Sequence, residues 1–487
     1  MKMINKFLLV VLVGVMASCA SFTDGLTTDP NAPTDADALN MIQGPMVMTQ
    51  FFHAGEVARL TGIWTNHFTG QDRQYVALND WNAHTSTDSD SPWGNAYYGV
   101  TQCRLIQAKA DVELNPRMKG IAQVLEAHMM GTVTSLWGDV PFSEAIDDSN
   151  PNPAYDAQED VYAGLQTLLD DAIINLNAGG AGLTAVKDIF YAANYTRWIQ
   201  LANALKARYY LHVGDYTNAN TYAQLGMQSA ADDMVANFGN LYGSTFNPFY
   251  SFMVYDRPGY MGAEDAYAPN LMDPDDIFSD PYNANRNHSK QMEGARYYYN
   301  YHYYELYTSG YEPNYLNGFD WGCTNCGKFG EDMRLVTYAE MLLIRAEYEA
   351  RVNGLTAGVA AYNTYRALMA TAGTYWTTTL GEYGGVDMQP YVDGDFAPGG
   401  LEDPNSTASD PVNALLREIY EERYVFFAGS TESFVDMNRT NNIAEIQLKD
   451  YDGVPQRLLY PQDEVNTNTS TPNPIPDVLT PTPVHNN

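Results

Sequence analysis

The chain has 487 residues, and its 26 Lys and Arg stand against 59 Asp and Glu, which gives a formal net charge of −33 at pH 7. Nucleic acids and anionic lipid surfaces bind clustered cations, so this balance argues against both as partners. The length suggests two or three domains, or one large body built from repeats.

Residues 1–18 have the pattern of a secretory signal peptide, in which two lysines precede an apolar run over Phe7–Ala17. The run is too short to cross a bilayer, because a spanning helix needs about 20 apolar residues. Cys19 follows Val15-Met16-Ala17-Ser18, which looks like a bacterial lipobox. We therefore predict cleavage before Cys19 and lipid attachment to its thiol. The alternative is plain secretion with an incidental cysteine.

After this anchor, residues 19–35 are rich in Thr, Asp, Pro and Asn and predict a linker, which leaves residues 36–487 as one body. Apolar residues recur at helical spacing in nine segments of that body. The predicted helices cover residues 36–59, 93–114, 117–137, 160–177, 195–212, 219–230, 335–352, 357–370 and 412–427. The first of them is expected to kink at Gly44-Pro45.

The pairing of these helices predicts a mainly α fold, similar to a tetratricopeptide stack, with long irregular insertions and little β structure. Small residues at Ala122, Ala127 and Gly131 would let a partner helix approach closely. The helical repeats are expected at about 93–231 and 335–439, with an insertion at about 240–330 between them and a C-terminal segment over 440–487.

The insertion is rich in aromatic residues. Residues 242–321 hold 21 aromatic side chains in 80 positions, about twice the 13% of the whole chain, and Ala295–Gly322 alone holds nine Tyr. A tyrosine ring packs on apolar faces while its hydroxyl stays hydrated, so this composition favours a wet recognition surface. The alternative is a Tyr-rich sheet edge or an irregular insertion packed on itself.

Cysteine usage adds one structural expectation. Cys323 and Cys326 form a Cys-x-x-Cys pair, which in an exported protein is most simply a local disulfide. A zinc half-site is the second interpretation, but no other Cys or His pair at ligand spacing completes it. Cys103 lies in a predicted helix and is expected to be a buried thiol.

Four stretches of the chain resemble, in order, the motifs of SusD/RagB-type outer-membrane lipoproteins. They are VLEAHMMGTVTSLWGDVPFSEA (Val124–Ala145), VTYAEMLLIRAEYEARVNG (Val336–Gly354) with AAYNTYRA (Ala360–Ala367), EERYVFFAGSTESFVDMNRT (Glu421–Thr440), and VPQRLLYPQDEVNTN (Val454–Asn468). Each is a short helix pattern, but four in order behind a lipobox cover nearly the whole chain. Phe426, Ser430 and Ser433 stand where the main branch usually has acidic residues and Arg, which favours the divergent second branch.

The resemblance implies a binding protein without catalytic activity. Such proteins are held on the outer face of the outer membrane by lipid at the Cys19 position, and they cap a SusC-like TonB-dependent transporter as a hinged lid. Their helical repeats face the transporter and their insertions carry the ligand site. The ligand is then an oligosaccharide held by aromatic stacking, or an oligopeptide, which would need backbone hydrogen bonds and side-chain pockets.

Within such a site, the first candidates are Trp81 with Asn82, and Trp321. A Trp side chain is costly to expose unless it has a function, and Asn both donates and accepts hydrogen bonds. Arg296, Tyr301, Tyr303 and Tyr304 come next. If residues 297–307 form a strand, the odd-numbered tyrosines share a face; if they form a helix, Tyr297, Tyr301 and Tyr304 do. The other tryptophans are expected in the core, namely Trp64, Trp93, Trp137, Trp198 and Trp376.

An enzyme is the competing class. A surface α-helical glycoside hydrolase or lyase would also be exported, acidic and aromatic-rich, but with 59 acidic residues any carboxylate pair is uninformative. The chain has no HExxH and no G-x-S-x-G sequence. No cofactor is expected, since the acidic turns at 273–276 and 393–395 that could bind Ca²⁺ are more often simply solvated. A purely structural surface-layer protein is disfavoured by the helical repeats.

Overall fold

The fold of residues 36–147, 149–272, 290–303, 311–313, 332–371, 374–375, 387–449 and 453–485 is described by a computed structural model. It is mainly helical, as the sequence predicts. No helix in these ranges is long and apolar enough to cross a membrane.

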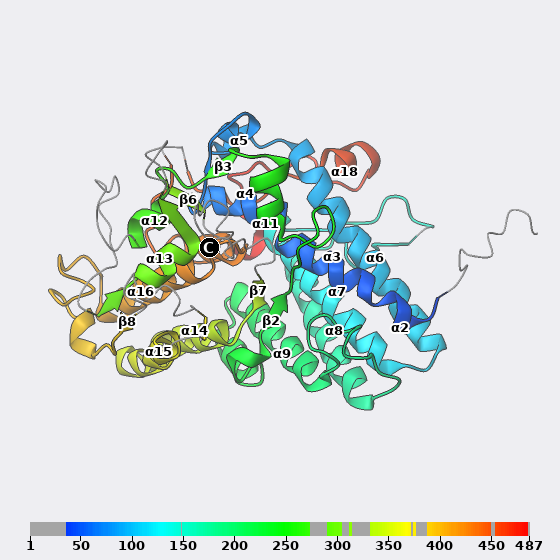
Figure 1. The fold of residues 1–487 in the computed structure, drawn as a ribbon, viewed down its shortest axis with the longest axis horizontal. Coiled ribbons are helices and arrows are strands. Elements are labelled where there is room, and N and C mark those ends of the chain that lie inside the picture. The colour runs from blue at the N-terminus through cyan, green and yellow to red at the C-terminus, as the bar shows by residue number, and fades with distance from the viewer. Residues whose placement is uncertain are drawn as a thin grey trace, which may run out of the picture.

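A stack of long helices forms the body, and Figure 1 shows α6 to α9 lying side by side, with α14 and α15 extending the stack. Each of these helices packs against the next one along the chain, from α6 through to α16. Their bounds are α6 Asp90–Val112, α7 Pro116–Trp137, α8 Gln158–Ala178, α9 Tyr195–His212, α10 Tyr216–Ala223, α14 Tyr338–Tyr348, α15 Leu355–Met369 and α16 Pro411–Phe426. The predicted helical pairs are therefore confirmed.

Helix α7 packs against α3 (Gln43–His53), α6, α8 and α9, and nearly all of its residues are buried. Pro116 opens it, where the missing N–H costs nothing, and Gly138 ends it at φ 86°. Close approach depends on Gly131, because a Cβ there would lie 2.1 Å from Cζ of Tyr209 on α9. The Tyr209 hydroxyl donates to the Ala127 carbonyl at 2.8 Å, which fixes the ring over the glycine.

Gly131→Ala is therefore expected to lower the free energy of unfolding by about 1–3 kcal/mol through overpacking. The matched control is Gly94→Ala on α6, where a Cβ would meet no atom within 4 Å. That change is expected to stabilise by about 0.5–1 kcal/mol, because alanine is the better helix former. Urea unfolding of both variants measures the difference, and equal effects would contradict the close packing at Gly131.

The N-terminal helices depart from the prediction of one helix with a kink at Gly44-Pro45. The chain instead forms α2 Ala38–Met41, α3 Gln43–His53 and α4 Glu56–Trp64, with breaks at Ile42 and at Ala54-Gly55. Pro45 lies in the first turn of α3, where proline is tolerated, so it does not bend the helix. The predicted helix 219–230 is also shifted, because Asp215 caps the Asn218 N–H at 3.0 Å and starts α10 early.

Strands are few and short, and in the described ranges they form four antiparallel pairs. The pairs are β1 Thr69–Gly70 with β3 Met261–Gly262, β2 Met234–Ala236 with β7 Met333–Val336, β4 Gln291–Met292 with β8 Asp387–Met388, and β5 Tyr301–Tyr303 with β6 Tyr311–Pro313. Three of these pairs join parts of the chain that are far apart in sequence. The β1–β3 and β4–β8 pairs tie the insertion to residues outside it, and the β2–β7 pair joins the two segments that flank it.

Short helices complete the described fold. They are α5 Gln74–Ala77, α11 Pro248–Tyr250, α12 Tyr267–Met272, α13 Gly294–Asn300, α17 Glu432–Arg439 and α18 Gln462–Thr467. Single turns of 3₁₀-helix lie at Trp81–Ala83, Ser86–Ser89, Ala230–Asp232, Asp393–Phe396 and Pro483–His485, and π-helical turns at Ser251–Asp256 and Glu349–Asn353. Helix α17 was not predicted from the sequence.

The C-terminal segment closes the fold against the end of α7. The Leu458 N–H donates to the Leu136 carbonyl at 2.8 Å, and Trp137 Nε1 donates to the Leu459 carbonyl at 2.9 Å. The Tyr460 hydroxyl donates to the Asp139 carbonyl at 2.7 Å. The first long helix pair is thus completed by residues from the far end of the chain.

The core contains the side chains that the sequence assigned to it. Trp64, Trp93, Trp137 and Trp198 are all buried, and Cys103 is a buried free thiol. Trp376 lies outside the described residues.

Candidate functional site

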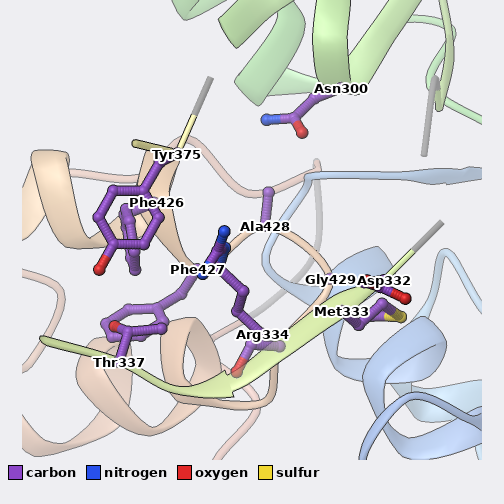
Figure 2. A pocket seen from close by; sticks show the side chains of 11 residues that line it. Asn300, Asp332, Met333, Arg334, Thr337, Tyr375, Phe426, Phe427, Ala428 and Gly429 are labelled. Carbon is purple, nitrogen blue, oxygen red and sulfur yellow. The ribbon is translucent and has the colours of Figure 1, made fainter. Parts of the chain in front are cut away.

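A solvent-open hollow, with a cavity volume of about 90 Å³, lies where strand β7 and the start of α14 meet the loop after α16 (Figure 2). Its described lining residues are Asn300, Asp332, Met333, Arg334, Thr337, Tyr375, Phe426, Phe427, Ala428, Gly429 and Ser430. We call this hollow the β7 pocket. It combines one wall of aromatic rings with a few polar groups, which is the usual composition of a small-molecule site.

Three rings make the aromatic wall. Phe426 packs edge-on against Tyr375 at a centroid distance of 5.5 Å and against Phe427 at 5.4 Å. Arg423 lies behind this wall, with Cζ 4.9 Å from the Phe427 ring centroid. Figure 2 shows the rings of Tyr375, Phe426 and Phe427 gathered on one side of the pocket. Tyr375 and Phe426 are half-buried and offer ring surface at low entropic cost, whereas Phe427 is 6% exposed and mainly supports Phe426.

Asp233 contacts both Arg334 and Tyr375. Arg334 Nη1 lies 2.8 Å from Oδ2 of Asp233, and the Tyr375 hydroxyl lies 3.5 Å from Oδ1. The Arg334 guanidinium sits over the Tyr375 ring, with Cζ 4.8 Å from the centroid. Strand pairing explains the arrangement, because β2 places Val235 opposite Arg334 and Asp233 directly precedes that strand. The cation at the pocket therefore already has a counter-ion.

The Asp233 carboxylate is buried, and burial raises its pKa to about 6. The Tyr338 N–H, which donates to Oδ1 at 2.8 Å, and the Arg334 charge oppose this rise. The carboxylate is thus ionised at neutral pH and keeps the Arg334 charge balanced there.

Asn300 supplies a neutral polar group to the pocket. It ends α13 and is 3% exposed, and Figure 2 shows its amide above the other lining side chains. An amide both donates and accepts hydrogen bonds, which suits a hydroxyl or acetamido group. Within the ranges that the structure covers, no group of three or more His, Cys, Asp or Glu could hold a metal ion. The pocket thus offers an amide together with apolar ring surface.

Trp81 and Asn82, the first sequence candidates, lie together on a 3₁₀ turn that Asp80 caps. Asn82 is exposed. The Trp81 side chain is 1% exposed and belongs to the main apolar core. The expectation of an exposed indole is therefore corrected, since the ring has no free face on which a ligand could stack.

Arg296 and Tyr301 are corrected in the same way, since both are 0% exposed. Arg296 Nε donates to Glu293 at 2.6 Å, and its Nη2 lies 3.0 Å from Glu422 Oε2 on α16. The same Glu422 carboxylate accepts from the Tyr365 hydroxyl. These contacts make Arg296 a buried cross-link between the insertion and the helical body.

The remaining candidates lie wholly or partly outside the described residues. The backbone of Tyr303 lies in β5, next to Tyr301, but its side chain is outside the described residues, as are Tyr304, Trp321, Cys323 and Cys326. Both alternatives for residues 297–307 are partly right, because α13 ends at Asn300 and a strand follows.

Of the acidic turns, Asp395 pairs with Lys290 and Asp393 accepts from Thr356, while 273–276 lie outside these ranges.

The pocket residues Arg334, Tyr375 and Phe427 are not among the sequence candidates. A signal was nevertheless present, because Phe426 and Ser430 were noted as departures from the usual family pattern, and both line the pocket.

A family model described as "Starch-binding associating with outer membrane" matches residues 30–461. The chain belongs to this SusD-like family. No curated protein matches it. The family assignment confirms the resemblance inferred from the four sequence motifs.

Solved SusD-like structures share the fold. A SusD/RagB family protein from Bacteroides thetaiotaomicron is 18% identical, with a TM-score of 0.62 over 90% of this chain and 95% of that one. A SusD homolog from Bacteroides uniformis is 18% identical, with a TM-score of 0.64 over 93% and 100%. A chitin-binding SusD homolog from Flavobacterium johnsoniae is 15% identical, with a TM-score of 0.60 over 91% and 98%. At these identities the comparison shows a shared fold.

Proposed function

We propose that this SusD-like protein is a non-enzymatic, carbohydrate-binding protein of the outer-membrane surface. It captures an oligosaccharide and delivers it to a SusC-like TonB-dependent transporter, for which it forms the lid. The β7 pocket carries the proposal, because it joins three aromatic rings to an amide and a charge-balanced guanidinium. The family description and the chitin-binding relative support a glycan as the ligand class.

The pocket chemistry favours a neutral glycan. Aromatic faces stack on the apolar faces of sugar rings, and Asn300 and Arg334 can bond the hydroxyls. An anionic sugar would meet a guanidinium that Asp233 already neutralises, with the exposed Asp332 carboxylate beside it. A lid must also release its ligand into the transporter, so moderate affinity from stacking suits the task.

The N-terminal segment supports a position at the membrane. In this proposal the lipid on Cys19 holds the protein to the outer membrane, with the helical stack toward the transporter. Globomycin, which blocks the lipoprotein signal peptidase, is expected to leave an uncleaved precursor. Processing that is insensitive to globomycin would contradict the anchor.

Filling the pocket tests the site. Ala428 lines it and is half-buried, so Ala428→Trp is expected to obstruct it and to weaken glycan binding at least about ten-fold, which corresponds to about 1.4 kcal/mol. Calorimetry with starch and chitin oligosaccharides measures the change. The matched control is Ala178→Trp at the exposed end of α8, which should bind as the native protein does. Equal binding by both variants would contradict the pocket assignment.

The alternatives give different results in the same assays. Oligopeptide capture predicts binding on a peptide array with none on a glycan array. Chain shortening of bound glycans on prolonged incubation would show an enzyme and overturn the binding-only proposal. Co-isolation of a TonB-dependent barrel from outer membranes is expected for the lid, and isolation of the protein alone would count against it.

A further inference from the structure

A second aromatic surface lies on the insertion, outside the β7 pocket. Tyr242 and Tyr255 are 55% and 50% exposed, yet their ring centroids are only 4.7 Å apart at an interplanar angle of 33°. Exposed rings that pack side by side form a wider apolar plate than either ring alone. We call this pair the tyrosine plate.

The plate is built on a firm base. Phe246 is buried beneath it, with centroid distances of 5.8 Å to Tyr242 and 5.5 Å to Tyr255. Tyr250 is also buried and lies 5.9 Å from Tyr255. Four rings are therefore packed together, of which two remain open to solvent.

Hydrogen bonds fix the orientation of the plate. The Tyr242 hydroxyl donates to Asp256 Oδ1 at 2.8 Å, and Ser251 Oγ donates to Oδ2 of the same carboxylate at 2.8 Å. The loop that carries Tyr242 turns at Gly243, with φ 71°, and is closed by the Gly239 N–H donating to the Thr245 carbonyl at 2.7 Å. With the Tyr242 hydroxyl engaged, its ring face is left for a ligand.

The plate lies close to the pocket along the chain. The Phe238 N–H donates at 3.2 Å to Oδ1 of Asp332, which lines the pocket. Tyr242 follows Phe238 by four residues, and four residues span at most about 14 Å even when fully extended. This separation is no longer than a few linked sugar rings.

We propose that the tyrosine plate is an outer subsite that holds the continuing chain of a neutral oligosaccharide whose end lies in the β7 pocket. The inference rests on the proposed function and adds a preference for longer ligands. The Asp256 carboxylate at the edge of the plate disfavours acidic sugars, and the open ring faces suit the C–H faces of neutral ones. The plate contributes stacking alone, so it tolerates variation in the sugar.

Binding of a length series tests the subsite. The double variant Tyr242→Ala/Tyr255→Ala is expected to weaken binding of long malto- or chito-oligosaccharides about ten-fold, while binding of the disaccharide of the same series stays unchanged. Tyr242→Phe keeps the ring and loses only the bond to Asp256, so it should bind long oligomers more tightly than the double variant does. Tyr98→Ala removes an exposed ring elsewhere and serves as the control.

The outcomes separate this inference from the proposed function. If the double variant binds long oligomers as tightly as the native protein while Ala428→Trp abolishes binding, the plate is not a subsite and the pocket stands. An equal loss for the disaccharide and the long oligomers would also overturn an outer subsite. If the native protein binds neither series, the proposed function fails and the inference fails with it. Circular dichroism of each variant confirms that the fold is retained.

Discussion

Replacement of Arg296 by alanine is expected to lower the free energy of unfolding by about 3–5 kcal/mol. The guanidinium is fully buried between the Glu293 and Glu422 carboxylates. Removing it leaves two buried carboxylates without their shared cation, and desolvation makes such uncompensated charge costly. Because Glu293 precedes α13 and Glu422 lies on α16, the loss also loosens the insertion from the helical body.

Chemical denaturation measures this effect, and the matched control is Arg73→Ala. Arg73 pairs with Asp72 at 3.6 Å, but its side chain is 72% exposed, so its removal should change stability by less than about 1 kcal/mol. Arg296→Lys should lie between the two variants, because lysine keeps the charge and loses the fork of hydrogen bonds. If Arg296→Ala is as stable as the control while ligand affinity falls, Arg296 is a ligand contact after all.

Acidification is expected to destabilise the protein between pH 6.5 and about 4, because His53 and His67 are buried as neutral side chains. Burial lowers the pKa of each from 6.5 to about 4, and the hydrogen bonds to the carbonyls of Thr49 and Tyr424 offset this only in part. His53 also stacks on His128, at a centroid distance of 3.8 Å. The charge of Arg208 disfavours a second cation at His53 and lowers its pKa further. Charging either ring inside the fold is therefore unfavourable.

The sign of the effect follows from proton uptake. Below pH 6.5 the unfolded chain protonates these histidines while the folded chain does not, so stability is complete above pH 6.5 and falls until about pH 4. Each histidine contributes up to about 3 kcal/mol to this loss. Together they remove a large share of the roughly 5–15 kcal/mol that stabilises a typical domain.

Urea midpoints recorded across this pH range test the prediction. His53→Gln keeps hydrogen-bonding capacity without a titratable ring, so its stability should depend less steeply on pH. Arg73→Gln removes an exposed charge and should leave the slope as it is. Midpoints of the native protein that stay constant from pH 7 to pH 4 would contradict the neutral buried histidines.

Much of the helical body could be predicted from the sequence, because its signals are local. Helix α9 begins and ends at the predicted residues, and α7 is bounded by Pro116 and Gly138, whose effects on the backbone do not depend on distant contacts. The kink expected at Gly44-Pro45 was wrong, since the effect of a proline depends on whether it lies in the first turn or the interior of a helix.

The site was harder to predict, because residue type alone does not determine exposure. Trp81 and Arg296 have the chemistry of ligand contacts, yet one packs in the core and the other pairs with two carboxylates. Asp233, Arg334 and Tyr375 meet at the β7 pocket because β2 pairs with β7 and because Tyr375 comes from a distant part of the chain. No local sequence pattern encodes these contacts. Tyr242 and Tyr255 lay within the aromatic segment that the sequence selected, but their pairing required the folded loop.

The contact between the end of α7 and the C-terminal segment also bears on the kinetics of folding. Trp137 bonds the carbonyl of Leu459, which follows it by 322 residues, so the first helical pair cannot be finished until nearly the whole chain is present. Contacts of such long sequence separation slow folding and expose intermediates to aggregation. Native structure is therefore completed only after the last segment has been delivered, and shortening the chain before Leu458 should trap it in a partly assembled state.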